Sequence, residues 1–201
     1  MYENQCSMMR DKTILRKEYK NIRKNIADDK RVYKEKLIET KFFEILNSFV
    51  NKIRNVFIYN SFSSEVRTGE IISKLINSEY RVYVPKCNES NETMIAAVYK
   101  VGQNQTKNSY GIYEPDDNEY ADENIDLIVA PGICFDRFGT RIGFGKGYYD
   151  KFINSLAYKP IVVAICFSEQ IFDGEIPRDE HDCIMDYIVT DKEIIHTKEK
   201  K

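Results

Sequence analysis

The chain contains the stretch Ile125-Asp-Leu-Ile-Val-Ala-Pro-Gly-Ile-Cys-Phe-Asp-Arg-Phe-Gly-Thr-Arg-Ile-Gly-Phe-Gly-Lys-Gly-Tyr-Tyr-Asp150. It begins with a mainly apolar run over residues 125–130, which predicts a buried strand. Four glycines then fall within nine residues, between Gly139 and Gly147. Apolar residues resume at helical spacing at Phe152, Ile153 and Leu156. The stretch therefore predicts a strand, a glycine-rich loop and a helix in succession.

The same alternation of strands and helices extends outward in both directions. Further strands are predicted over residues 55–59, 81–84, 93–99, 161–167 and 187–189, and amphipathic helices over residues 12–26, 28–49 and 68–76. Several strands are apolar throughout, which is typical of a parallel sheet covered on both faces. The expected fold is a three-layer α/β, Rossmann-like single domain over residues 1–201, with a mainly parallel sheet flanked by helices. Residues 1–11 and 192–201 are expected to form loose termini.

Composition excludes several classes of protein. The longest apolar run, residues 161–167, is far shorter than the roughly 20 residues needed to span a bilayer. The first residues lack the apolar core of a secretory signal. The five cysteines are scattered and include no Cys-x-x-Cys pair. We therefore expect a cytoplasmic protein with reduced thiols and no membrane partner, and a monomer by default.

Charge is distributed unevenly along the 201 residues, although the net charge is only −2. Residues 1–54 hold 14 Lys and Arg against 8 Asp and Glu, whereas residues 111–126 hold seven acids and no base. A basic first helix is one way to bind nucleic acid. It lacks the interleaved aromatic residues on which single-stranded bases stack, and mixed charge is more typical of a solvated helix face. We therefore expect no nucleic-acid partner.

The glycine-rich loop is the best candidate for a binding site. A loop between a strand and a helix brings backbone N–H groups and the helix dipole toward one point, which favours an anion. Its spacing matches neither the P-loop nor the dinucleotide fingerprint, and a flexible hairpin or β-bulge is the alternative reading. Arg141 and Lys146 supply donors for phosphate, and Asp150 supplies oxygen for Mg²⁺. Together they favour a polyphosphate site.

The run from Ala130 to Asp150 strongly resembles the signature of the 5-formyltetrahydrofolate cyclo-ligase family. Three other segments are similar to that family in order and spacing: Lys12-Thr-Ile-Leu-Arg16, residues 59–68, and Ile176-Pro-x-x-x-His181-Asp182-x-x-x-Asp186. The resemblance spans nearly the whole chain. It implies ATP-dependent closure of 5-formyltetrahydrofolate to 5,10-methenyltetrahydrofolate, with ADP and phosphate as products, Mg²⁺ as cofactor and ATP as co-substrate. The implied route passes through a phosphorylated formyl group.

The resemblance also implies the following site residues. ATP would be bound by Lys12, Arg16, Arg141, Ile142, Gly143, Phe144, Gly145, Lys146, Gly147, Tyr148 and Tyr149. The folate, with or without a polyglutamate tail, would be bound by Asn60, Glu65, Phe144, Gly145, Lys146, Gly147 and Tyr148. Lys146, Arg141 and Tyr148 would be catalytic. Asp150 and Asp182 would hold Mg²⁺.

Each of these assignments has a simpler structural alternative. Glu65 is also a favourable early-helix acid, and Tyr148 and Tyr149 are also ordinary packing residues in a chain with 14 tyrosines. Asp186 is interpreted as the start of the last strand and stays outside the metal set. Arg67 stands where the family often carries an acid. The broader alternative is a non-catalytic nucleotide- or folate-binding module of the same fold.

Overall fold

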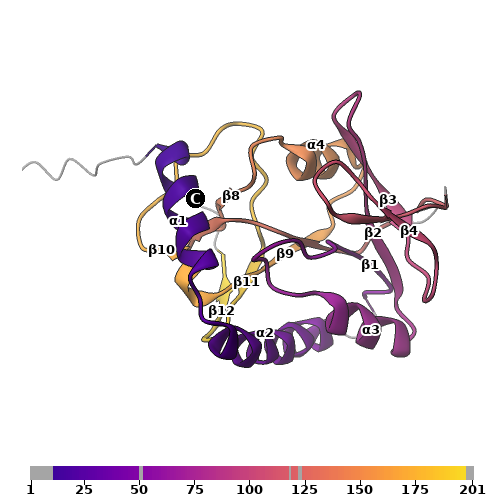
Figure 1. Cartoon of the computed structure of the whole chain (residues 1–201), viewed down its shortest axis with the longest axis horizontal. Helices are drawn as coiled ribbons and strands as arrows, with labels where there is room; N and C mark the ends of the chain where they lie inside the picture. The colour runs from indigo at the N-terminus through magenta and orange to yellow at the C-terminus, as the bar shows by residue number, and fades with distance from the viewer. Residues whose placement is uncertain (1–10, 50–51, 118, 122–123, 198–201) are drawn as a thin grey trace, which may run out of the picture.

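A computed structural model describes residues 11–49, 52–117, 119–121 and 124–197 (Figure 1). The helices are α1 (Lys12–Lys24), α2 (Asp28–Ser48), α3 (Gly69–Asn77) and α4 (Tyr148–Ser155), with a 3₁₀ turn η1 (Ser168–Gln170). The strands are β1 (Asn55–Ile58), β2 (Arg81–Asn88), β3 (Thr93–Val98), β4 (Gln105–Lys107), β5 (Tyr113–Pro115), β6 (Leu127–Ala130), β7 (Cys134–Asp136), β8 (Arg141–Ile142), β9 (Ile161–Ile165), β10 (Ile171–Phe172), β11 (Tyr187–Val189) and β12 (Ile194–His196). Within these residues, no helix is both long and apolar enough to cross a membrane.

A seven-stranded sheet in the order β12-β11-β9-β6-β1-β2-β3 forms the centre of the molecule. The five strands from β11 to β2 are parallel, whereas β12 and β3 pair antiparallel at the two edges. All four residues of β1 and of β6 are buried, because both faces of this sheet are covered. The predicted α/β class with a mainly parallel sheet is confirmed.

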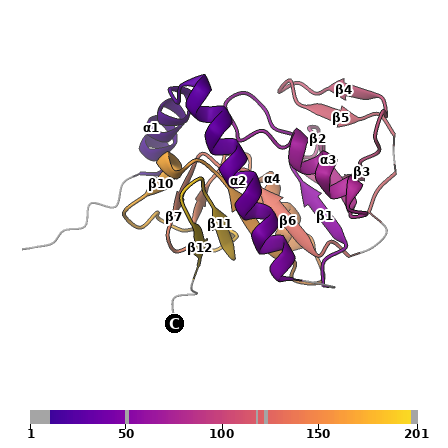
Figure 2. The same cartoon turned by 90° about the horizontal axis from the view of Figure 1, so that it is seen from below.

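The two faces of the sheet are covered by different structures. Alternate residues of β1 point to opposite faces: Val56 and Ile58 pack in the core cluster with α2 and α3, and Phe57 packs with Phe152 of α4. Figure 2 shows α2 and α3 side by side across the first face. On the second face, α4 lies beside a small sheet in the order β10-β7-β8. The predicted three layers are present, but helices alone do not form the second outer layer.

Helix α1 packs against the small sheet and not against the central one. Leu15 and Tyr19 share a buried cluster with Ile133, Cys134 and Ile142. This places α1 beside the segment that leads into and out of the glycine-rich loop. The helix thus reaches the predicted binding site from outside the central three layers.

The expectation of loose termini needs correction where the chain is described. Residues 1–10 and 198–201 lie outside the described residues. Asp11 caps α1 by accepting a hydrogen bond from the Thr13 N–H at 2.6 Å. At the other end, β12 pairs with β11 and buries Ile195 to 7% exposure. This strand of three residues was not predicted from the sequence.

Candidate functional site

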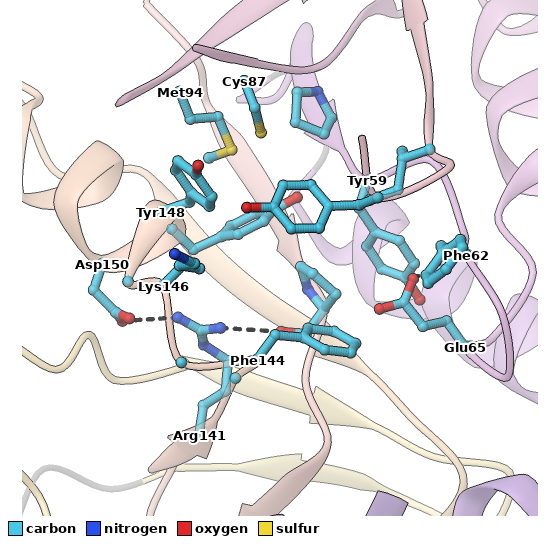
Figure 3. Close-up of a pocket in the computed structure, with 18 of the residues that line it drawn as sticks. Tyr59, Phe62, Glu65, Cys87, Met94, Arg141, Phe144, Lys146, Tyr148 and Asp150 are labelled. Carbon is cyan, nitrogen blue, oxygen red and sulfur yellow. Dashed lines mark hydrogen bonds and ion pairs between the residues drawn. The ribbon is translucent and has the colours of Figure 1, made fainter. Parts of the chain in front are cut away.

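A cavity of about 380 Å³ opens beyond the carboxyl ends of β1 and β6 (Figure 3). Tyr59 and Asn60 follow β1 into it, and Pro131 follows β6. The glycine-rich loop, the start of α1 and the β2–β3 hairpin supply other walls. Ligands of parallel α/β sheets bind at this edge, where the strands end and loops diverge.

The glycine-rich loop has a conformation that depends on its glycines. Gly145 and Gly147 have φ angles of +102° and +69°, which residues with a Cβ rarely adopt. At Gly143 a Cβ would lie 2.9 Å from Nη1 of Arg141, so a side chain there would displace the guanidinium. Gly147 is also the N-cap of α4, which directs the helix N-terminus toward the cavity wall.

Arg141 is the buried cation of this loop. Its Nη2 donates to Oδ1 of Asp150 at 2.7 Å, and its Nη1 donates to the carbonyl oxygen of Pro131 at 3.2 Å. Its side chain is only 5% exposed, and its Nε has no hydrogen-bond partner among the described residues. The guanidinium also lies 5.7 Å from the centre of the Tyr149 ring. Figure 3 shows it beneath the cavity, between Asp150 and Phe144.

Helix α1 brings two more cations to the loop. Nζ of Lys12 lies 2.6 Å from Asp179 and 2.5 Å from Asp182, two carboxylates some 170 positions away along the chain. Nε of Arg16 donates to the carbonyl oxygen of Gly143 at 3.0 Å. The i, i+4 spacing predicted from sequence therefore places both side chains at the cavity, where both line its wall.

The two aspartates predicted to hold a metal come from segments that touch each other. Oδ1 of Asp150 accepts a hydrogen bond from the backbone N–H of Cys183 at 3.2 Å, and Asp182 is the preceding residue. In the protein alone each carboxylate pairs with a cation, Asp150 with Arg141 and Asp182 with Lys12. Among residues 11–49, 52–117, 119–121 and 124–197 there is no cluster of three His, Cys, Asp or Glu suited to a metal. Two carboxylates fit Mg²⁺ that arrives with phosphates and keeps several waters.

Lys146 lies at the mouth of the cavity rather than inside it. Its side chain is 54% exposed, and its Nζ is 3.5 Å from Oε1 of Glu92 in the β2–β3 turn. Lys151 pairs with the other oxygen of the same carboxylate at 3.2 Å. The two lysines lower the pKa of Glu92, the interaction with Lys151 being the larger cause. The Lys146 ammonium is therefore held by one weak, solvated contact that a ligand can replace.

Glu65 is the buried acid on the other side of the cavity. It is 6% exposed, and its Oε2 accepts a hydrogen bond from the Phe62 N–H at 2.9 Å. Burial raises its pKa to about 7, although that hydrogen bond and the nearby Arg23 act in the opposite direction. Asn60 precedes it in the same loop and donates from Nδ2 to the carbonyl oxygen of Tyr113 at 2.7 Å. The early-helix alternative for Glu65 is wrong, because α3 begins only at Gly69.

All predicted site residues except one therefore line the same cavity. Those that line it are Lys12, Arg16, Asn60, Glu65, Arg141, Gly143, Phe144, Gly145, Lys146, Gly147, Tyr148, Tyr149, Asp150 and Asp182. Ile142 does not line it, because its side chain is 1% exposed within the cluster under α1. The alternation of β8 explains this difference: Arg141 and Ile142 point to opposite sides.

Sequence reasoning did not predict the part of the cavity wall that the β2–β3 and β4–β5 hairpins form. It also did not predict some lining residues next to the predicted ones. The additional lining residues are Tyr59, Phe62, Pro85, Cys87, Met94, Tyr110, Ile112, Glu114, Pro131 and Asp179. Glu114 is 9% exposed and accepts from the Cys87 N–H at 3.0 Å and from Asn108 at 2.8 Å. Burial and contact with the Tyr110 hydroxyl raise the pKa of Tyr148 to about 12, so it stays a neutral donor. Glu114 lies in the acidic run, and Tyr59, Phe62, Pro131 and Asp179 lie in segments that resemble the family, whereas the others gave no local signal.

Comparisons with known proteins show which family the chain resembles. The family model described as 5-formyltetrahydrofolate cyclo-ligase family matches residues 8–191. A probable 5-formyltetrahydrofolate cyclo-ligase of Schizosaccharomyces pombe is 33% identical over 159 residues, covering 72% of this chain and 78% of the relative. The 5-formyltetrahydrofolate cyclo-ligase of Mus musculus is 29% identical over 188 residues, covering 87% and 91%. The mitochondrial enzyme of Arabidopsis thaliana is 33% identical, and the match spans 56% of its length.

Solved structures give the same result for the fold. The NMR structure of Aquifex aeolicus 5,10-methenyltetrahydrofolate synthetase superposes with a TM-score of 0.79 at 26% identity, covering 94% of both chains. The 5,10-methenyltetrahydrofolate synthetase of Mycoplasma pneumoniae gives 0.72 at 23% identity, over 90% of this chain and 99% of that one. The match covers residues 8–191, which include the glycine-rich loop and the segments that line the cavity at the strand ends. The chain therefore belongs to the 5-formyltetrahydrofolate cyclo-ligase family.

Proposed function

We propose that the chain converts 5-formyltetrahydrofolate and ATP to 5,10-methenyltetrahydrofolate, ADP and phosphate, with Mg²⁺ as cofactor. The observation that carries this proposal is the convergence of the cations of α1 and β8 and the buried acid Glu65 on a single cavity. Lys12, Arg16 and Arg141 line one side, and Glu65 lines the other. A site with this polarity suits a polyanion beside a ligand that donates hydrogen bonds.

ATP would bind along the glycine-rich loop, with its phosphates between α1 and α4. Lys12 is paired with two acids, and Nε of Arg16 donates to a backbone carbonyl. The guanidinium of Arg16 and the ammonium of Lys12 would hold the phosphate oxygens from these positions. Backbone N–H groups near Gly145 and Gly147 add neutral donors close to the N-terminus of α4. Ile142 would contribute through its backbone alone, because its side chain is buried elsewhere.

Mg²⁺ would be held by Asp150 and Asp182 together with the phosphates. When bound, the ion would neutralise charge on the phosphate oxygens. The pairing of Asp150 with Arg141 and of Asp182 with Lys12 places both carboxylates beside cations before any ligand arrives. The protein thus supplies a partly assembled set of charges that nucleotide phosphates complete.

The folate would bind on the Glu65 side, near Asn60. An ionised carboxylate there accepts hydrogen bonds from the amino-pyrimidine edge of the pterin. Phe144, Tyr148 and the glycines between them all line the cavity and would lie between this side and the phosphate side. The formyl oxygen would then lie next to the γ-phosphoryl group.

The chemistry requires ATP because a formamide oxygen is a poor leaving group. The γ-phosphoryl group passes to the formyl oxygen, breaking its bond to ADP and forming an imino-phosphate. N10 of the folate attacks the formyl carbon, the carbon–oxygen bond breaks, and the N10 proton leaves with the phosphate. Three groups would stabilise charge on the transferring group: the Arg141 guanidinium, the neutral Tyr148 hydroxyl and the Lys146 ammonium. Lys146 would first leave its contact with Glu92.

The decisive experiment mixes the purified protein with 5-formyltetrahydrofolate, ATP and Mg²⁺. The near-ultraviolet absorbance of a methenyl folate should rise only when all three are present, with one ADP released per ring closed. Binding of both ligands without this absorbance would favour the alternative, a non-catalytic nucleotide- or folate-binding module. Absence of binding as well as turnover would contradict the proposal.

Location and assembly follow as predictions of the same proposal. A cytoplasmic monomer that acts on small molecules needs no nucleic acid or membrane surface. Size-exclusion chromatography with light scattering measures the mass in solution, and a mass of two chains would contradict the monomer. Retention on immobilised DNA or RNA at moderate salt that falls steeply as the salt concentration rises would contradict the absence of a nucleic-acid partner.

A further inference from the structure

Arg23 is the largest fully buried side chain in the described part of the molecule and has no role in the function proposed so far. It lies in the last turn of α1 and is 2% exposed. An arginine cannot lose its proton under ordinary conditions, so this is a permanent charge in a position with little water. Such a charge is costly unless its donors are paired.

The contacts of Arg23 connect the two sides of the cavity. Its Nε donates to Oγ of Ser64 at 3.1 Å, and its Nη1 lies 4.0 Å from Oε1 of Glu65. The same Nη1 donates to the carbonyl oxygen of Gly132 at 3.0 Å, just after β6. The guanidinium carbon lies 5.6 Å from the centre of the Phe144 ring in the glycine-rich loop. One side chain therefore contacts the folate-side loop and the nucleotide-side loop.

We propose that Arg23 is a positioning residue that fixes the Glu65 loop against the glycine-rich loop and places a positive charge beside the Glu65 carboxylate for folate binding. This inference rests on the proposed function. Arg23 acts through Glu65 and Phe144 and does not line the cavity itself, which separates it from Lys12 and Arg16 of the same helix. The geometry assigns this role to Arg23, since no other described cation forms an ion pair with Glu65.

The electrostatic surroundings of Glu65 support a dependence on pH. The groups that face it are Arg23 from α1, Tyr59 after β1 and Tyr149 from α4. Both tyrosines have a pKa well above the usual value because of burial, so they are neutral and Arg23 is the one full charge. The pKa of Glu65 is about 7 with Arg23 present. Removing an opposite charge at this distance raises the pKa of a carboxyl group by about one unit or more.

The expected pH profile follows in sign. Glu65 must be ionised to accept hydrogen bonds, so kcat/KM for 5-formyltetrahydrofolate should fall as the pH drops through about 7. In Arg23→Gln the pKa of Glu65 rises, so this fall should move upward by about one pH unit. At neutral pH the ionised fraction then drops from about one half to about one tenth, a loss of about fivefold in kcat/KM. The loss should appear in KM for the folate more than in kcat.

Arg31→Gln is the matched control. Arg31 also anchors this loop, because its Nη1 donates to the carbonyl oxygen of Ser64 at 2.8 Å and its Nη2 donates to that of Arg23. It forms no ion pair with Glu65 and stacks on Phe167 instead of Phe144. A general loosening of the loop would alter both variants alike. A role through the Glu65 charge should move the pH profile of Arg23→Gln and leave that of Arg31→Gln in place.

The measurement is kcat/KM against pH for wild type, both variants, Glu65→Gln and the double variant Arg23→Gln/Glu65→Gln. Glu65→Gln should abolish the fall at low pH, and adding Arg23→Gln to it should change the pH dependence no further. An Arg23→Gln profile identical to that of wild type would overturn the inference while leaving the proposed function intact. If wild type itself forms no methenyl folate, the proposed function fails instead.

A second variant covers the case in which Arg23→Gln does not fold. Arg23→Lys keeps the charge but loses the planar group that reaches Ser64 and Gly132 together. It should keep the pH profile of wild type and raise KM for the folate severalfold. Wild-type KM in Arg23→Lys would overturn the positioning role.

Discussion

Individual side chains in this site owe their properties to the groups beside them. Glu65 and Glu92 are both glutamates, but one has a raised pKa through burial and the other a lowered pKa through two exposed lysines. Lys12 and Lys146 are both predicted phosphate ligands, but the first is mostly buried between two acids and the second mostly exposed. The residue type alone does not reveal these differences.

Lys146→Ala should lower kcat by about a hundredfold or more, because it removes a charge offered to the transferring phosphoryl group. The matched control is Lys151→Ala, since Lys151 shares Glu92 with it but does not line the cavity. Steady-state kinetics of methenyl formation measures both. Similar losses in the two variants would show that the effect comes from Glu92 and not from catalysis.

Asp150→Asn should raise the Mg²⁺ concentration needed for half-maximal activity by about tenfold or more, because it removes one carboxylate offered to the ion. Asp186→Asn is the control: Asp186 accepts a hydrogen bond from the Val162 N–H at 2.8 Å at the start of β9, away from the cavity. Magnesium titrations at fixed ATP compare them. A shift in Asp186→Asn as large as that in Asp150→Asn would place the metal elsewhere.

At the scale of elements, the loops are held by tight backbone packing. The turn between β7 and β8 contains Gly139 at φ +91°, where a Cβ would lie 2.6 Å from the carbonyl oxygen of Met185. This turn carries β8, and β8 carries Arg141 into the site. The glycine therefore matters for the position of the buried cation although it lies outside the cavity.

Gly139→Ala should lower the free energy of unfolding by more than Gly102→Ala does. Gly102 has a similar φ of +75° but nothing within 4 Å of a Cβ, so it reports the conformational cost alone, about 1 kcal/mol. The clash at Gly139 should add about 1–3 kcal/mol. Urea unfolding followed by circular dichroism measures the difference. Equal costs would mean that the Met185 segment moves aside freely.

At the scale of the whole molecule, the site joins parts that are remote along the chain. Lys12 meets Asp182 across 170 positions, and α1, the glycine-rich loop and the segment around Asp182 close one wall of the cavity. A ligand bound there bridges all three. Binding should therefore stabilise the entire fold and not one element.

ATP with Mg²⁺ should raise the melting temperature by several degrees, whereas Mg²⁺ alone should leave it unchanged. The reason is that the two aspartates proposed to hold the metal are already paired with Lys12 or Arg141, so the ion would need phosphates to complete its ligands. Differential scanning calorimetry with each ligand alone and with both tests this. A stabilisation by Mg²⁺ alone equal to that by Mg²⁺ and ATP would show a resident metal site.

Local sequence patterns predicted the α/β class, the mainly parallel sheet and the helices α1 to α4, because apolar periodicity reports which face of an element is buried. They also predicted the glycine-rich loop as a candidate anion site, because glycines and the cations Arg141 and Lys146 were concentrated in one loop, whereas Lys12 and Arg16 were implied by the family resemblance. The sequence did not predict six strands of two or three residues each: β4, β5, β7, β8, β10 and β12.

The sequence by itself thus determined the fold class and the loop that favours a polyanion, since both depend on residues close together along the chain. Only the tertiary structure decided that Lys12 pairs with Asp179 and Asp182, that Arg23 is buried between Glu65 and Phe144, and that the β2–β3 and β4–β5 hairpins complete the cavity. The physical reason is that burial and pairing of charge depend on distances in space, and no local spacing along the chain encodes a contact between segments that meet only after the sheet has formed.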